Sequence, residues 1–214
     1  MRRPLACVVV LALLGAGAAL GGPPQERITA ADQARARAML LRKSDVGLGF
    51  RASPPGPEGD TSCKALDESD LTVTGEARSP NFVSGLVTVA SNTDVYESVA
   101  DANASWKRGT SAGGLKCLRD TVRREYAKRG LRLLALRKTS FPAVAPKTVA
   151  FHVAFSGQAQ GLEIRAYVDL VALQQSRAQT SLAFASAIDP LEQPEQVRLA
   201  RIVASRMARA MRGS

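Results

Sequence analysis

The chain has few of the residues from which metal centres are built. It contains one histidine, His152, and three cysteines, Cys7, Cys63 and Cys117, which lie far apart in the sequence. Zinc sites in proteins use histidine and cysteine ligands at short spacings. This scarcity excludes a typical zinc site, and we expect neither a metal nor another cofactor.

Long apolar runs are absent apart from one near the N-terminus. Two arginines precede an uncharged run over residues 5–20, and residues 16–18 (A-G-A) fit a signal-peptidase site. The run is shorter than the ~20 residues of a membrane span. We therefore expect residues 1–22 to be a signal peptide that is cleaved between Ala18 and Gly22, with an uncleaved anchor as the alternative.

Loss of this leader would leave two cysteines, Cys63 and Cys117, in a single secreted domain of residues 23–214. An even number of cysteines in an oxidising compartment predicts a disulfide. Two free buried thiols are the alternative. The segment 53–62, just before Cys63, holds three prolines and two glycines and is expected to be a loop.

Acidic and aromatic residues are also scarce. The chain has 29 basic residues against 19 acidic ones, a formal net charge of +10, and only 5% aromatics. Positive charge favours anionic partners such as phospholipid headgroups or wall polymers. Nucleic acid is not an expected partner, because a secreted protein does not meet it. The expected partner is instead an unknown small-molecule or cell-wall ligand.

The spacing of apolar residues predicts an α+β domain. Helices are expected at 29–43, 94–108, 115–129 and 191–211. Strands are expected at 82–90, 131–138, 148–155, 162–173 and 177–187.

The last three strands predict a sheet with two different faces. Pairing Val153 with Ile164 brings their bulky residues, together with Leu182 and Phe184, to one face for helices to cover. The other face would carry alanines and the polar side chains His152, Glu163, Arg165, Tyr167 and Asp169. Small residues with a few polar groups fit a shallow ligand-binding cleft. An ordinary solvated face is the alternative, and a histidine near carboxylates also permits acid–base catalysis by a hydrolase.

The last predicted helix is basic on one side. Its cations are Arg198, Arg201, Arg206, Arg209 and Arg212, and apolar residues lie opposite them. A basic amphipathic helix can dock on an anionic membrane surface. The alternative is a terminal helix that packs on the sheet and leaves its arginines in solvent.

Three segments carry a resemblance to known proteins. They are LLRKSDVGLGF (40–50), VTVASNTDVYESVADANASW (87–106) and LKCLRD (115–120). Their order resembles actinobacterial secreted sensor-type domains, similar to the extracellular sensor domain of mycobacterial receptor serine/threonine kinases and to LpqN/PsbP-like lipoproteins. The resemblance implies a twisted, mainly antiparallel sheet with helices packed on one face, used for binding rather than catalysis. The kinase domain carries two disulfides, whereas the mature chain could form one.

The sequence therefore favours a non-catalytic extracytoplasmic protein of ligand-binding or sensor type. An envelope protein that docks on a membrane through its last helix is the alternative, and a hydrolase is the third possibility.

Overall fold

One large sheet forms the centre of the computed structural model, which describes residues 22–55, 63–159, 162–187 and 189–212. Its strands are β1 (Gln25–Glu26), β2 (Arg51–Ser53), β3 (Thr72–Arg78), β4 (Asn81–Ser84), β5 (Val87–Tyr96), β6 (Arg132–Thr139), β7 (Lys147–Ala159), β8 (Leu162–Gln175) and β9 (Ala178–Ser186). Their order is β1-β3-β5-β9-β8-β7-β6, with β4 between β5 and β2. All these neighbours are antiparallel except β1 and β3. The predicted α+β class with a mainly antiparallel sheet is confirmed.

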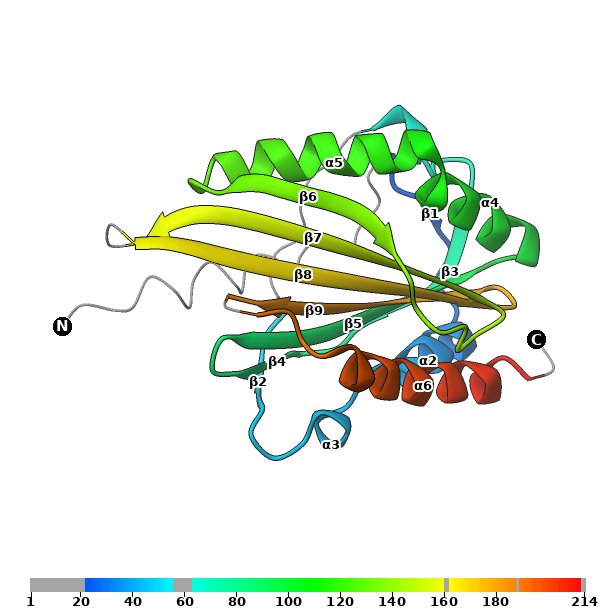
Figure 1. Cartoon of the computed structure of the whole chain (residues 1–214). Coiled ribbons are helices and arrows are strands. Elements are labelled where there is room, and N and C mark those ends of the chain that lie inside the picture. Colours follow the sequence, from blue (N-terminus) through cyan, green and yellow to red (C-terminus); the bar gives the residue numbers. More distant parts are fainter. Residues whose placement is uncertain (1–21, 56–62, 160–161, 188, 213–214) are drawn as a thin grey trace.

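Helices cover both faces of this sheet. They are α2 (Ala30–Met39), α3 (Lys43–Val46), α4 (Val99–Thr110), α5 (Ala112–Ala127) and α6 (Gln193–Ala210), with a 3₁₀ turn η1 (Lys64–Leu66). Figure 1 shows α4 and α5 above the sheet and α2, α3 and α6 below it. The expectation of helices on one face is therefore wrong. Within the described residues, no helix is long and apolar enough to cross a membrane.

The reason for two covered faces lies in β8. Its Val168 packs in the cluster under α5, whereas Val171 packs in the cluster over α2 and α6. A strand that is apolar on both sides requires cover on both sides. The alternation of Leu162 to Leu170 does not continue through the second half of the strand.

The two helix-covered cores confirm the predicted apolar faces of two helices. On α5, Val122 and Tyr126 pack on Phe155, and the rings of Tyr126 and Phe155 are 4.5 Å apart. On α6, Val203 and Met207 are fully buried in the other cluster.

Some element boundaries differ from those that the sequence predicts. The expected strand 82–90 is a hairpin, because the chain turns at Gly85, where φ is +57°. The expected helix 94–108 begins only at Val99, where the Ser98 side chain accepts a hydrogen bond from the Asp101 backbone. Residues 94–96 instead continue β5, and strand β3 was not predicted at all.

A disulfide joins Cys63, next to η1, to Cys117 in α5, with Cα atoms 6.3 Å apart. This separation is within the usual range for disulfides, and the predicted cross-link is confirmed. The predicted leader, except for Gly22, and residues 56–62 of the predicted loop lie outside the described residues.

A buried ion pair ties α2 to the sheet. Arg177, in the β8–β9 turn, donates to both carboxylate oxygens of Asp32 at 2.7 and 2.8 Å, and the Thr74 hydroxyl donates to the same group at 2.6 Å. The Arg177 hydrogen bond, against the opposing effect of burial, holds the pKa of Asp32 well below its usual range.

Candidate functional site

His152 lies directly opposite Asp169 in the β7–β8 ladder. Its Nδ1 is 2.6 Å from Asp169 Oδ1, and Asp169 Oδ2 accepts a 2.7 Å hydrogen bond from the Gln196 side chain of α6. Gln196 also donates to the backbone oxygen of Leu191. We name His152, Asp169 and Gln196 the α6 latch, because they join the sheet to the first turns of α6.

The register differs from the predicted one. Val153 pairs with Val168 rather than Ile164, although the shift is even and keeps each side chain on its face. Of the other predicted residues, Tyr167 is near, with its ring 5.9 Å from that of His152. Glu163 and Arg165 are exposed and lie farther along the hairpin. The five predicted residues therefore do not converge on one point.

The expected alanine-lined face around His152 holds for Ala150 and Ala154 of β7 but is wrong for β9. Phe184 pairs with Asp169, so Phe184 and Leu182 lie on the His152 side, whereas Ala185 packs in the cluster under α5. The helix α6 covers the His152 side, and the side chain of His152 is only 18% exposed. We interpret the latch as structural, and ligand binding there remains a prediction.

The latch contains part of a catalytic triad. A histidine held by a carboxylate can act as a general base for a hydroxyl or thiol nucleophile. Within the described part of the chain, no serine, threonine or cysteine hydrogen-bonds to His152. Residues 109–113 match G-x-S-x-G, but Ser111 lies between two helices rather than after a strand, and its hydroxyl caps α5. Neither feature forms a nucleophilic centre.

The arginines in α6 and just after it fall into two groups. Arg206 is largely buried and donates to both carboxylate oxygens of Asp45 at 2.6 and 2.8 Å and to the Leu40 carbonyl. Burial opposes ionisation of Asp45, but the Arg206 hydrogen bonds keep its pKa below the usual value. The exposed group is Arg198, Arg201, Arg209 and Arg212. Arg206 is thus a structural residue and not available to a membrane.

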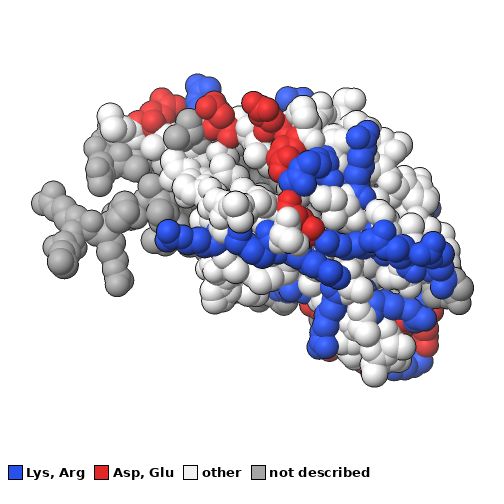
Figure 2. Space-filling model, turned by 90° about the horizontal axis from the view of Figure 1, so that it is seen from below, with Lys and Arg blue, Asp and Glu red and all other residues white. Residues whose placement is uncertain are grey.

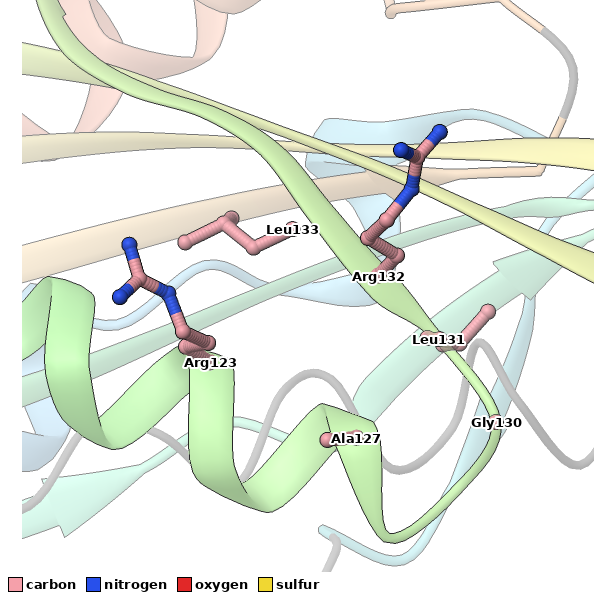
Figure 3. Close-up of a pocket in the computed structure, with 6 residues that line it drawn as sticks. All are labelled: Arg123, Ala127, Gly130, Leu131, Arg132 and Leu133. Atoms are coloured by element: carbon pink, nitrogen blue, oxygen red, sulfur yellow. The ribbon is translucent and has the colours of Figure 1, made fainter.

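A hollow of about 330 Å³ opens where α5 ends and β6 begins (Figure 3). Its lining residues are Arg123, Ala127, Gly130, Leu131, Arg132 and Leu133. Gly130, with φ at +74°, makes the tight turn that folds β6 back beside the helix. In the view of Figure 3, the Leu133 side chain lies between the guanidinium groups of Arg123 and Arg132. The hollow thus combines an apolar lining with two cations.

The two arginines of the hollow differ from the cations beside them. Lys128 pairs with Glu125 at 2.7 Å, and the Arg129 guanidinium lies 5.6 Å from the Tyr126 ring centre. Arg123 and Arg132, in contrast, form no ion pair or hydrogen bond with any residue that the structure describes. Sequence reasoning missed this site. The available signal was a pair of arginines, Arg123 and Arg132, on either side of Gly130, which directly follows the expected helix 115–129.

A group of carboxyls lies elsewhere, where β3 and β5 meet. Asp94 pairs with Glu76, and Glu68 accepts a hydrogen bond from Tyr96 two positions farther along β5. Burial raises the pKa of Asp94 to about 7, and the charges of Glu76 and Glu68 add to the effect. Among the described residues, no group of three or more histidine, cysteine, aspartate or glutamate side chains is placed to hold a metal ion.

Comparisons with known proteins find several similar solved structures, among them two from Mycobacterium tuberculosis. The extracellular domain of PknH from Mycobacterium tuberculosis is 10% identical, with a TM-score of 0.49 over 83% of this chain and 96% of that domain. LpqN, involved in cell envelope biogenesis of Mycobacterium tuberculosis, is 11% identical, with a TM-score of 0.28 over 78% of this chain and 86% of LpqN. The predicted resemblance to these two kinds of protein is confirmed. No protein-family model and no curated protein matches the chain.

Proposed function

We propose that the protein is a non-catalytic binding module that works outside the cytoplasm and takes an anionic ligand with an apolar part into the hollow between α5 and β6. The observation that carries the proposal is the pair Arg123 and Arg132, which form no ion pair or hydrogen bond with a described residue, beside an apolar lining. Guanidinium groups form strong, charge-assisted hydrogen bonds with carboxylate and phosphate oxygens. Leu131 and Leu133 offer apolar contact to the rest of the ligand.

The size and place of the hollow support this proposal. Small-molecule sites in proteins have volumes of roughly 300–1,000 Å³, and the hollow measures about 330 Å³. It lies near the end of the helix that the Cys63–Cys117 disulfide ties to the rest of the fold. A disulfide is typical of proteins outside the cytoplasm, which supports the proposed location.

Octyl phosphate is a suitable probe, because it combines an anionic group with a short apolar chain. We expect it to raise the melting temperature of the protein more than octanol or inorganic phosphate does at equal concentration. Arg123→Gln and Arg132→Gln should each weaken its binding about tenfold, since hydrogen bonds to charged groups contribute about 1.5–3 kcal/mol. Titration calorimetry measures the affinities.

Matched variants separate this site from others. Arg137→Gln removes an exposed cation from the same strand outside the hollow, and should leave the affinity unchanged. The pair of variants His152→Ala and Arg165→Ala tests the sheet face predicted from the sequence. Octyl phosphate binding that survives Arg123→Gln/Arg132→Gln but is lost in His152→Ala would overturn the proposed site and restore the predicted one.

A further inference from the structure

Leu48 is the most exposed large apolar side chain of the described residues. It is fully exposed, between Gly47 and Gly49, in the loop that joins α3 to β2. Gly47 has a φ of +86°, a conformation that favours glycine, so the turn holds Leu48 out from the surface. None of the residues that the structure describes covers this side chain.

Cations lie close to this loop. The Lys43 ammonium group donates to the Gly47 carbonyl at 2.6 Å, and Arg198 of α6 donates to the Asp45 carbonyl at 2.7 Å. The buried Arg206–Asp45 ion pair fixes α3 against α6. The fold thus holds an exposed leucine within a short stretch of backbone that contacts two basic side chains.

The positive charge extends along α6. At 100° per residue, Arg198, Arg201 and Arg209 fall within about 80° of one another, on the side opposite Val203 and Met207, and Arg212 follows just after the helix ends. Figure 1 places α6 and α3 together at the bottom of the molecule, and the view from below in Figure 2 shows a band of Lys and Arg across that face. We call this surface the basic face. It comprises Leu48 with Arg42, Lys43, Arg198, Arg201, Arg209 and Arg212.

We propose that the basic face docks on an anionic phospholipid bilayer, with Leu48 inserted between the headgroups. Peripheral membrane proteins combine cations that face anionic lipid with apolar side chains that enter the interface. A protein partner fits less well, because protein interfaces bury an apolar or aromatic centre, whereas Leu48 is a single leucine among cations. The proposal is independent of the proposed ligand, and it would leave the hollow on the opposite side of the sheet accessible.

The test measures binding of the protein, purified from the cells that produce it, to vesicles of phosphatidylglycerol and phosphatidylcholine. Two local variants report on the face: Leu48→Ser, and Arg201→Gln combined with Arg209→Gln. Each should lower the vesicle affinity about tenfold, and raising the salt from 0.1 to 0.5 M should have a similar effect by screening. In Leu48→Trp, addition of these vesicles should shift the indole emission to shorter wavelength, above the background of Trp106.

Control variants lie away from the basic face. Leu162→Ser removes another exposed leucine, and Arg137→Gln combined with Lys138→Gln removes two cations of β6. These variants should bind vesicles as the unchanged protein does. The proposal fails if the two sets of variants lose equal affinity, if Leu48→Trp shows no emission shift, or if vesicles of pure phosphatidylcholine bind equally well.

Discussion

The fold places the Asp94 carboxyl in surroundings that disfavour its charged form. Burial and the neighbouring Glu76 and Glu68 disfavour its charged form, and only Arg78 opposes them. It accepts no side-chain hydrogen bond from any residue that the structure describes. The folded protein therefore keeps a proton on Asp94 up to a pH of about 7, whereas the unfolded chain releases it near 3.8. Stability is therefore lost as the pH rises from about 3.8 to about 7, and above that range the charged Asp94 carboxylate destabilises the fold.

Asp94→Asn should therefore stabilise the protein at pH 8 and change little at pH 4. Where the folded pKa is raised, stability falls as pH rises from the unfolded value to the folded value, and the amide removes that loss. We expect a rise in melting temperature of several degrees at pH 8, since 1 kcal/mol corresponds to roughly 2–4 °C for a protein of this size. Asp120→Asn, on the exposed side of α5, is the control. An equal shift at both pH values would show that Asp94 is ionised throughout.

At the scale of elements, we expect the hydrogen bonds of the α6 latch to stabilise the packing of α6 on the sheet. Removing one partner of a buried polar contact leaves the others unsatisfied, at a cost of about 1–3 kcal/mol. His152→Ala and Gln196→Ala should each lower the melting temperature by several degrees. The double variant should lower it by less than the sum, because both act through Asp169. Arg165→Ala, on an exposed side chain of the same face, should have little effect. Strictly additive losses would show that the three residues do not act together.

The position and the buried face of a helix were predictable where the spacing of its apolar residues alone determines which side is buried. Tyr126 in α5 and Met207 in α6 lie in the expected cores. The start of α4 was not predictable in this way, because residues 94–96 fit a helical pattern but pair with β3 and β9. Tertiary pairing outweighs local pattern in such segments.

The candidate sites were less predictable than the elements. Alternation fixes the face of each strand residue but not the pairing, because any even shift keeps every side chain on its face. The sequence therefore placed His152 and Asp169 on one face without showing that they bond. The hollow depends on Gly130 folding β6 back beside α5. Leu48 follows Gly47, whose positive φ is visible only in the structure.

For the whole molecule, two sets of carboxyls couple stability to pH in opposite directions. The arginine-bound Asp32 and Asp45 have lowered pKa values. Their contribution is complete above the unfolded value near 3.8 and is lost as pH falls through their folded values. Asp94, Glu68 and Glu76 have raised pKa values, mainly through burial, and reduce stability as pH rises above the acid range.

The protein should therefore be most stable at mildly acidic pH, at about 4–6, rather than at neutral pH. Melting temperatures measured in steps from pH 3 to pH 9 test this expectation directly. Asp94→Asn should flatten the decline on the alkaline side, whereas Asp32→Asn should lower stability mainly above pH 4 and flatten the acid side. A maximum at pH 8 would contradict the raised pKa values of Asp94, Glu68 and Glu76. It would show that solvent reaches the junction of β3 and β5 and keeps Asp94 charged in the folded protein.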